Sequence, residues 1–297
     1  MAESGARLAE TVLSVARKAA QHMTERGLEN ARLESELLLA EVLGIKRLDL
    51  YLQFDRPLTE DELEKYRGFV RRRLRREPLQ YIVGRAGFRK LDFEVNRSVL
   101  IPRPETEVLV DQVLSWVREH GAETVLDVGT GSGAIAVSVA NESAARVVAT
   151  DVSAEAIAVA RRNAERAQVS DRVELRQGSL LEVLGAGESF PVIAANLPYV
   201  AQAEGAGLAP EVKDWEPGSA LFAGADGLDL IRVLVAEAWK HLSAPGLLVL
   251  EVGATQAAAV VSLIEAVAHY QNIRVIRDLA GRERIVRAEI LPPGEGS

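Results

Sequence analysis

Short apolar runs alternate with helical segments between residues 124 and 252, and this alternation constrains the fold more than any other feature. A strand followed by a helix and then another strand is typical of a parallel sheet covered by helices. The pattern therefore predicts an α/β fold with a doubly wound sheet. We expect strands at residues 124–128, 146–150, 173–176, 192–196 and 247–252, and helices from residue 133, from residue 154 and over residues 228–242.

The chain before this region indicates a small helical domain followed by a linker. Apolar residues recur at helical spacing from about Leu8 onward, and Thr59 with Glu62 forms a capped helix start. The arginine-rich run at residues 71–76 is expected to be a solvated helix end, although it could touch an acidic partner or RNA. We predict a helical domain over residues 1–76, a hairpin linker over residues 77–103 and an α/β domain over residues 104–297.

Short extended pieces are expected on both sides of the alternating region. In the linker these are residues 80–83 and 88–95, and together they indicate a hairpin. Near the carboxyl terminus, residues 273–278 and 284–290 predict a second, antiparallel hairpin appended to the sheet.

Composition excludes several classes of function. No segment approaches the ~20 uninterrupted apolar residues of a membrane span, and the first residues lack an export signal, so we expect a cytoplasmic protein. The chain contains no cysteine, which excludes disulfides and thiol nucleophiles, and its four histidines are too scattered to predict a metal site. A formal charge of −8 argues against affinity that depends on neutralising many phosphates of a nucleic acid.

The segment from Val125 to Gly133 is a strand that passes into a glycine-rich turn at a helix start. Glycines there allow a ligand to approach the backbone closely, and an acid at the end of the next strand, Asp151, could bind ribose hydroxyls. With Ala134 the turn also satisfies the fingerprint of nicotinamide dinucleotide sites. Asp127 favours S-adenosylmethionine instead, because a carboxylate can hold a cationic amino acid group but would repel a pyrophosphate.

The tetrapeptide Asn196-Leu197-Pro198-Tyr199 follows a buried strand and proposes a reaction. The Asn196 side-chain oxygen and the Leu197 carbonyl can each accept one N–H of a planar amide or amino group. Pro198 would stiffen the turn and Tyr199 would offer an aromatic wall. Alone, these residues would suit an ordinary strand-end turn. Because a glycine loop lies upstream, we favour the interpretation that this turn is a clamp. The clamp would hold the nitrogen of a substrate with its lone pair directed at an electrophile.

At this point the sequence resembles a known family, the protein-(glutamine-N(5)) methyltransferases of peptide chain release factors, also called the PrmC/HemK family. The resemblance covers nearly the whole chain and is carried by Glu77 to Gly84, Leu100 to Glu107, Glu216-Pro217, Ala220-Leu221, Gly224 to Leu228, and Leu250 to Gly253 with Gln256. It implies a Rossmann-like class I methyltransferase sheet joined to a helical N-terminal domain that recognises the substrate. It also implies methyl transfer from S-adenosylmethionine to the glutamine of a Gly-Gly-Gln loop in a release factor.

We expect a monomer with no membrane association and no stable nucleic-acid binding.

The resemblance also suggests where the cofactor and the substrate bind. The expected catalytic group is Asn196, Leu197, Pro198 and Tyr199, and the expected cofactor contacts are Asp127, Gly129, Thr130, Gly131, Ser132, Gly133, Asp151, Ser179, Leu180 and Asn196.

Two residues depart from the family's pattern. Leu197 replaces the first proline of an Asn-Pro-Pro-Tyr motif, which should loosen the turn but keeps the accepting carbonyl. Ser179 stands where related enzymes often carry an acid near the adenine amine, while Leu180 could still pack on the ring and offer its N–H.

Two other functions fit parts of the same pattern. The clamp would also suit the exocyclic amine of a flipped nucleic-acid base stacked on Tyr199. A non-catalytic assembly factor that binds the cofactor would keep the glycine loop but would not need the clamp. Methyl-transfer assays on protein and RNA substrates separate these alternatives.

Overall fold

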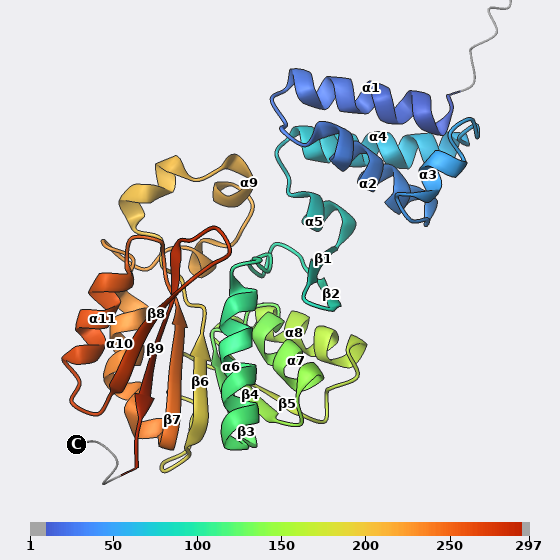
Figure 1. Cartoon of the computed structure of the whole chain (residues 1–297). Helices are drawn as coiled ribbons and strands as arrows, with labels where there is room; N and C mark the ends of the chain where they lie inside the picture. Colours follow the sequence, from blue (N-terminus) through green and yellow to red (C-terminus); the bar gives the residue numbers. More distant parts are fainter. Residues whose placement is uncertain (1–9, 293–297) are drawn as a thin grey trace, which may run out of the picture. The chain divides into compact units, whose positions relative to one another are not determined.

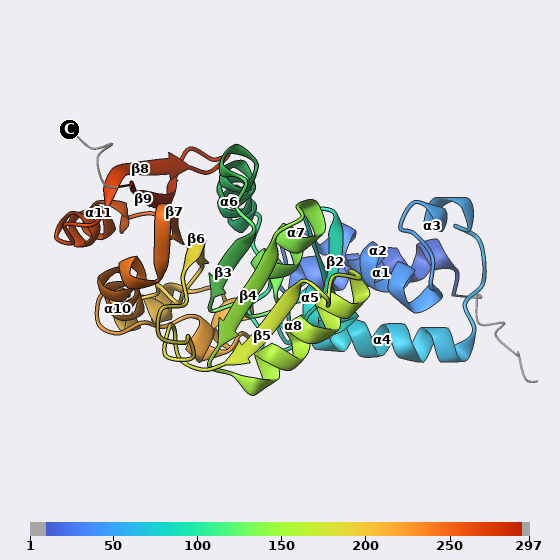
Figure 2. The same cartoon turned by 90° about the horizontal axis from the view of Figure 1, so that it is seen from below.

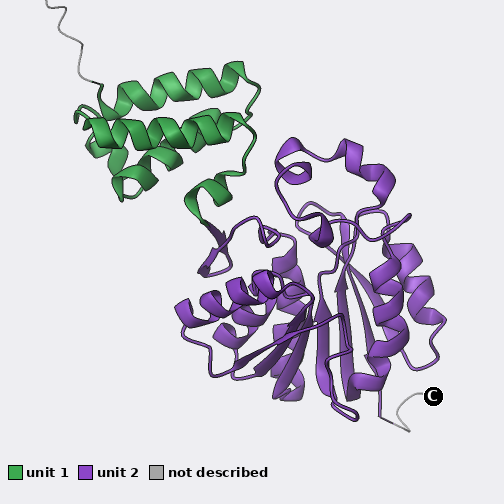
Figure 3. Ribbon diagram, turned by 180° about the vertical axis from the view of Figure 1, so that it is seen from behind, with its two compact units in different colours: residues 1–84 green, residues 85–297 purple. Residues whose placement is uncertain are grey.

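The computed structural model describes residues 10–292 and divides into two compact units, residues 1–84 and 85–297 (Figure 3). The expected helical start near Leu8 lies outside the described residues. The division follows Gly84, so the predicted linker contributes to both units.

The first unit is helical, as predicted. The predicted start at Thr59 is confirmed, because its side chain accepts from the Glu62 N–H while the Glu62 side chain accepts from the Thr59 N–H. Fully buried side chains, among them Met23, Leu38 and Tyr66, form its core. Its helices are α1 (Val12–Glu25), α2 (Ala31–Leu43), α3 (Asp49–Leu52), α4 (Glu60–Leu74) and α5 (Leu79–Val83).

The helix α5 corrects the prediction of an extended piece at residues 80–83. Pro78 precedes it with φ −54°, a value that suits a helix start, and Gly84 ends it in the left-handed conformation. Ile82, in this short helix, is buried in the core of the helical unit.

The arginine run is only in part the solvated helix end that we predicted, because Arg71 and Arg75 are exposed while the other three arginines bind within the unit. Arg72 donates to both carboxylate oxygens of Glu77, at 2.6 and 2.8 Å, and Arg73 binds Glu34 in the same two-pronged way. Arg76 donates to the carbonyls of residues 26 and 27. These guanidinium groups therefore fasten α4 to the rest of its own unit, which reduces the charge available to an external partner.

The second unit contains the predicted sheet. Its seven strands have the order β5-β4-β3-β6-β7-β9-β8, and the first five are parallel. The carboxyl-terminal hairpin is confirmed, because β8 and β9 pair antiparallel and β9 also pairs with β7. The strands are β3 (Thr124–Val128), β4 (Arg146–Asp151), β5 (Val173–Gln177), β6 (Phe190–Ala195), β7 (Leu242–Glu251), β8 (Gln271–Arg277) and β9 (Glu283–Ile290).

Helices cover both faces of this sheet (Figures 1 and 2). The first face carries α6 (Thr106–His120), α7 (Ala134–Glu142) and α8 (Ala154–Arg166), and the other carries α10 (Asp229–Ala238) and α11 (Ala257–Glu265). The sequence analysis did not predict α6 or α11. The short helix α9 (Pro210–Lys213) and the 3₁₀ helices η1 (Gln202–Gly207), η2 (Gly218–Ala220) and η3 (Trp239–His241) complete the unit.

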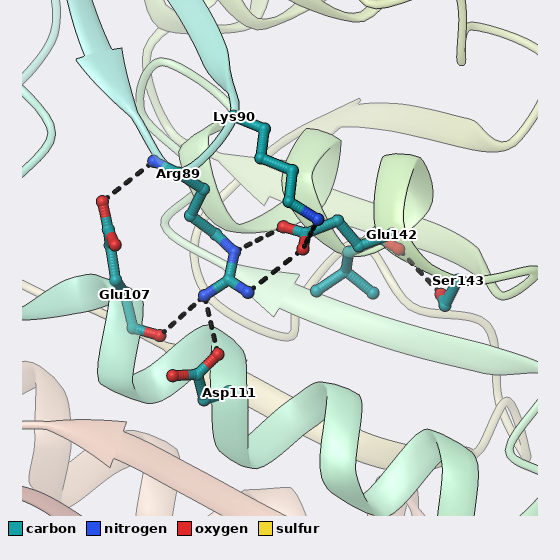
Figure 4. Close-up of polar contacts among 7 residues, drawn as sticks. Arg89, Lys90, Glu107, Asp111, Glu142 and Ser143 are labelled. Carbon is teal, nitrogen blue, oxygen red and sulfur yellow. Dashed lines mark hydrogen bonds and ion pairs between the residues drawn. The ribbon is translucent and has the colours of Figure 1, made fainter.

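The linker hairpin consists of β1 (Arg85–Phe88) and β2 (Leu91–Glu94), so its turn falls inside the piece that we expected to be continuously extended. Arg89 in that turn has φ +51°, a conformation that is unfavourable for a residue with a side chain. Figure 4 shows what holds it: its guanidinium binds Glu142 and Asp111, and its N–H donates to Glu107. Ion pairs with two helices thus fix a turn that carries no glycine.

Among residues 10–292, no helix is long and apolar enough to cross a membrane. The same part of the chain holds no group of three or more His, Asp or Glu side chains arranged to bind a metal ion.

Candidate active site

The register of the sheet brings three predicted site residues together. Val128 at the end of β3 pairs with Thr150 of β4 on one side and with Ala195 of β6 on the other. The residues that follow these positions, Gly129, Asp151 and Asn196, therefore emerge next to one another at the carboxyl edge of the parallel strands.

A cavity of about 300 Å³ lies at this edge. Every residue that lines it belongs to the second unit. The lining residues are Ser98–Leu100, Pro102, Arg103, Thr106, Gly129–Ser132, Ala134, Ile135, Asp151–Ser153, Ala156, Gly178–Leu180, Asn196–Pro198, Ser219, Ala220 and Leu230. Most of the predicted site residues are among them, and the exceptions are Asp127, Gly133 and Tyr199.

The glycine loop needs its glycines for different reasons. Gly129 has φ +76°, and a Cβ there would come within 2.9 Å of a Leu197 methyl carbon. Gly131 has φ +56° and only open space where its Cβ would be. The N–H groups of Gly129 and Thr130 both donate to the Thr150 carbonyl at 2.9 Å, which ties the loop to β4. The backbone at Gly131 is therefore accessible to a ligand in the cavity.

Gly133 contributes to packing rather than to the cavity wall. It has φ +83°, and a Cβ at this position would lie 3.2 Å from side-chain atoms of both Ala160 and Val137. The missing side chain lets the start of α7 approach α8 closely. Its predicted contact with a cofactor stays a prediction, and in the structure its missing side chain leaves room for Ala160 and Val137.

Asp127 lies beneath the glycine loop and is fully buried. Its Oδ2 accepts from the Thr130 hydroxyl at 2.6 Å and from the Ala136 N–H at 3.1 Å, while Oδ1 has no hydrogen-bond partner. Burial raises the pKa of this carboxyl to about 7. In the structure these hydrogen bonds make Asp127 a link between the glycine loop and the start of α7. Asp127 is not among the residues that line the cavity.

Asp151 lines the cavity at the end of β4. Its Oδ2 accepts from the Gly131 N–H at 2.8 Å and its Oδ1 accepts from the Ser153 N–H at 2.9 Å. Burial raises the pKa of the carboxyl, and the backbone hydrogen bonds oppose that shift. Asp151 therefore both shapes the glycine loop and presents a fixed acceptor to the cavity.

Ser132 is held by a residue that the sequence analysis did not single out. Asn163 of α8 donates to the Ser132 carbonyl at 2.8 Å and exchanges two hydrogen bonds with the backbone of Glu94 in β2. Asn163 is buried, so this amide links the hairpin to the loop. The three partners are distant in the sequence, and no local pattern connects them.

Ser179 and Leu180 form another part of the cavity wall. Leu180 has φ +47°, and its carbonyl accepts from the Thr150 hydroxyl at 3.1 Å. A branched residue in this conformation is strained unless its surroundings hold it. The hydrogen bond from β4 provides that restraint, and it fixes the wall next to Asp151.

Asn196 also lines the cavity, and its side chain is hydrogen-bonded to Thr106. The Asn196 Nδ2 donates to the Thr106 hydroxyl oxygen at 3.1 Å. Among the described residues, neither the Asn196 side-chain oxygen nor the Leu197 carbonyl accepts a hydrogen bond. Two acceptors on one turn are thus left for a ligand, as the clamp requires.

Leu197 is buried, and its side chain packs against Gly129 and into the core of the second unit. Pro198 lines the cavity beside it. The turn and the glycine loop are therefore in direct contact.

Tyr199 packs against the core of the second unit and is not among the residues that line the cavity. Its role as an aromatic wall for the substrate stays a prediction. Burial raises the pKa of its phenol to about 12. Its carbonyl accepts from Gln256 Nε2 at 2.8 Å, and the Gln256 oxygen accepts from the Gly253 N–H. Gln256 thus secures the end of the clamp to the loop after β7.

The segment between β6 and α10 lies at the same end of the sheet (Figure 1) and reaches the cavity through Ser219 and Ala220. Arg103 on the cavity wall binds Glu216 of this segment at 2.6 Å, and the Glu216 carboxylate is buried. Residues 98–103 were predicted to be linker, but several of them line the cavity. The run Leu100 to Glu107 is the sequence feature that could have identified them, since it carries part of the family resemblance.

Two family models match the chain. The model described as PrmC N-terminal domain matches residues 14–84, and the model described as ribosomal protein L11 methyltransferase (PrmA) matches residues 105–202. The boundary of the first match coincides with the end of the helical unit.

Curated relatives match over nearly the whole chain. The release factor glutamine methyltransferase of Geobacter sulfurreducens is 45% identical, with 91% of this chain and 93% of that protein covered. The chain belongs to the release factor glutamine methyltransferase family. The family's proteins from Gloeobacter violaceus and Rhodopirellula baltica are 42% and 37% identical, over 91% and 96% of this chain and 96% and 98% of their own lengths.

A solved structure supports the fold. The hMettl16 catalytic domain, in complex with MAT2A 3′UTR hairpin 6, superposes with a TM-score of 0.54 and 16% identity, covering 69% of this chain and 77% of that chain. At this identity the similarity shows a shared class I methyltransferase architecture and nothing about substrate.

The substitution Leu197→Pro, which restores the motif suggested by the resemblance, should be tolerated. Among the described residues the Leu197 N–H donates no hydrogen bond, so proline removes none. We expect a methylation rate within about threefold of wild type and an unfolding free energy lower by ~1 kcal/mol, because a smaller side chain fills the buried site. Steady-state assays and urea unfolding measure both quantities. A rate loss well beyond this would show that the Leu197 side chain, and not its carbonyl, matters.

Proposed function

We propose that this chain transfers a methyl group from S-adenosylmethionine to the side-chain amide nitrogen of the glutamine in the Gly-Gly-Gln loop of peptide chain release factors. The observation that carries the proposal is the turn at Asn196 and Leu197. It presents two unused acceptors at the cavity that the glycine loop also lines, in a chain of the release factor glutamine methyltransferase family. Two acceptors match the two N–H groups of a primary amide.

The residues around the cavity fit the cofactor. Gly131 offers backbone with open space beside it, Asp151 offers a charged acceptor for ribose hydroxyls, and Leu180 offers an apolar surface for the adenine ring. Asp127 would act through the loop that it anchors. When bound, S-adenosylmethionine supplies a methyl group made electrophilic by a sulfonium.

The protein's contribution to the reaction is orientation. An amide nitrogen is a poor nucleophile because its lone pair is delocalised into the carbonyl. Asn196 Oδ1 and the Leu197 carbonyl accept the two N–H groups, and this turns the nitrogen toward the position of the methyl. The same two oxygens favour the positive charge that develops on nitrogen. The proton then leaves to water, and no histidine is required.

Parallel methyl-transfer assays test this function against the alternative of a nucleic-acid amine. Purified enzyme is incubated with methyl-labelled S-adenosylmethionine and either a release factor or an RNA of similar mass. We expect label in the protein and none in the RNA. Label in the RNA alone would contradict the proposal.

We infer that the helical unit, residues 1–84, docks the release factor. None of the described residues of this unit, 10–84, lines the cavity, so we expect cofactor binding not to depend on them. It exposes large apolar side chains close together in the sequence, with exposed fractions of 69% for Leu48, 82% for Leu52 and 52% for Phe54. Exposed apolar side chains concentrated in one short segment are characteristic of protein-binding surfaces.

The double substitution Leu52→Ser and Phe54→Ser should raise the KM for intact release factor by about tenfold or more, the scale of losing apolar anchors at an interface. The rate at saturating substrate and the affinity for cofactor should not change. Leu279→Ser is the control, because Leu279 is a fully exposed leucine in the second unit. An unchanged KM in the double variant would place docking elsewhere.

We further infer that the enzyme acts as a monomer in the cytoplasm, without stable binding to nucleic acid. The cavity is complete within one chain, and the net charge is −8. Translation factors, the proposed substrates, are cytoplasmic in bacteria.

A further inference from the structure

The clamp works only with one orientation of the Asn196 amide. If Oδ1 faces the cavity, it accepts an N–H of the substrate. If the amide is rotated by about 180°, Nδ2 faces the cavity, and its N–H points at the N–H of the substrate, so no hydrogen bond forms. The two orientations have nearly the same shape, so packing alone cannot select between them. The hydrogen-bond partner behind Asn196 must decide.

That partner is Thr106, the first residue of α6. Its side chain is buried, with 3% of the residue exposed. A hydroxyl can either donate to an amide oxygen or accept from an amide nitrogen, so Thr106 by itself would allow both orientations of Asn196. A third group is needed to fix the direction of the hydroxyl proton.

Glu251, the last residue of β7, supplies this third group. Ala195 of β6 pairs with Leu250, so Glu251 lies beside Asn196 at the edge of the sheet. Glu251 is 1% exposed, and the Thr106 hydroxyl lowers the pKa of its carboxyl, so the two side chains lie close together. An ionised carboxylate can only accept a hydrogen bond, so a Thr106 hydroxyl that turns its proton toward Glu251 keeps a lone pair for Asn196 Nδ2.

We propose that Thr106 and Glu251 are positioning residues that fix the Asn196 amide with Oδ1 toward the substrate. The inference rests on the proposed function of the Asn196 clamp. Asn196 Nδ2 donates to the Thr106 hydroxyl oxygen at 3.1 Å, and the Thr106 hydroxyl then turns its proton toward Glu251. Glu251 Oε2 has no hydrogen-bond partner among the described residues, so the carboxylate is not committed to another structural contact by that oxygen.

The direction of donation reverses if Glu251 takes up a proton. A protonated Glu251 can donate to Thr106, which can then donate to the Asn196 oxygen and turn the amide over. Burial raises the pKa of Glu251 to about 7. Arg284 and Arg103 near it favour the ionised form and Glu105 opposes it, while the phenol of Tyr199 also faces it. Because the ionised form is the competent one, the methylation rate should rise as the pH increases through about 7.

The variant Thr106→Val keeps the shape of the side chain and removes the hydroxyl. We expect kcat to fall by about 10- to 100-fold, since a buried hydrogen bond that orients a reacting group is lost, with cofactor affinity within about twofold. Thr106→Ser should restore most of the rate. Ser138→Ala is the matched control, because it removes a buried hydroxyl of α7 that makes no hydrogen bond. A Thr106→Val enzyme with the wild-type kcat would overturn the inference.

The variant Glu251→Gln tests the direction in which Thr106 donates. A neutral amide can accept from Thr106 or donate to it, so both Asn196 orientations become accessible. We expect a lower kcat and the loss of the rise in rate near pH 7, whereas a merely structural role would leave the pH profile unchanged. Glu289→Gln removes another buried carboxylate and is the control. Retention of the wild-type profile by Glu251→Gln would contradict the proposal.

Nuclear magnetic resonance provides a readout that does not depend on turnover. The side-chain NH₂ signals of Asn196 are assigned by their absence in Asn196→Ala. In the wild-type protein above pH 7 one of these protons should be protected from exchange, and in Thr106→Val the protection should be lost. Equal exchange in the two proteins would overturn the inference even if no release factor were methylated. Failure of methylation with the predicted exchange behaviour would instead contradict the proposed function alone.

Discussion

Replacing Asn196 by alanine should lower the methylation rate by at least ~100-fold, the scale of losing one preorganised hydrogen-bond partner in an active site. The substitution removes the oxygen that accepts one substrate N–H and leaves the Leu197 carbonyl to orient the amide alone. Cofactor affinity should stay nearly unchanged, because the glycine loop and Asp151 carry most of the expected contacts. Single-turnover rates with a release factor and calorimetric titration of cofactor measure the two quantities.

Asn141→Ala is the control for this variant, because it removes an exposed amide of α7 and should leave the rate unchanged. An Asn196→Ala enzyme with near-normal turnover would mean that the substrate amide is held elsewhere. The clamp would then be an ordinary turn at the end of β6.

Replacing Asp151 by alanine should weaken binding of S-adenosylmethionine by about 1.5–3 kcal/mol, which corresponds to roughly 10- to 150-fold in Kd. The variant loses a charged acceptor for ribose hydroxyls and also the hydrogen bond that holds the Gly131 N–H at 2.8 Å. Both losses act on the cofactor, so the rate at saturating cofactor should change much less than the affinity.

Asp171→Ala is the matched control, since Asp171 is an exposed acid outside the cavity. Unchanged affinity in Asp151→Ala would remove Asp151 from the proposed cofactor site. An equal loss in Asp171→Ala would attribute the effect to net charge.

The sequence was sufficient to predict the sheet and the position of the glycine loop. The alternation of apolar runs and helices is a local signal, and it located β3, β4, β6 and the starts of α7 and α8 within a few residues. The sequence singled out Asp151 and Asn196 separately, and the sheet brings them to one edge because β4 and β6 both pair with β3 in parallel.

Contacts between distant segments could not be predicted in this way. Thr106 holds Asn196 across 90 positions of sequence, and Asn163 holds the backbone of Glu94 across 69. The periodic pattern of apolar residues along a chain gives no information about such pairs. The turn at Arg89 was missed for a related reason, because ion pairs with two distant helices stabilise a conformation that local propensity disfavours.

Two predicted site residues lie beside the cavity and are not among the residues that line it, so their contacts with a ligand stay predictions. Asp127 and Tyr199 have the side chains that a cofactor or an amide site would use, and both lie next to residues of the cavity. The structure directs the Asp127 carboxylate to Thr130 and the Tyr199 ring to the core. Sequence position alone does not specify the direction of a side chain at the end of a strand.

The most direct test of the central claim is mass spectrometry of a purified release factor after incubation with the enzyme and S-adenosylmethionine. The predicted result is one added methyl group, located by fragmentation on the glutamine of the Gly-Gly-Gln loop. It should be absent with Asn196→Ala enzyme in the same time and present with Asn141→Ala. An unmodified glutamine after incubation with active wild-type enzyme, or a methyl group on another residue, would contradict the account.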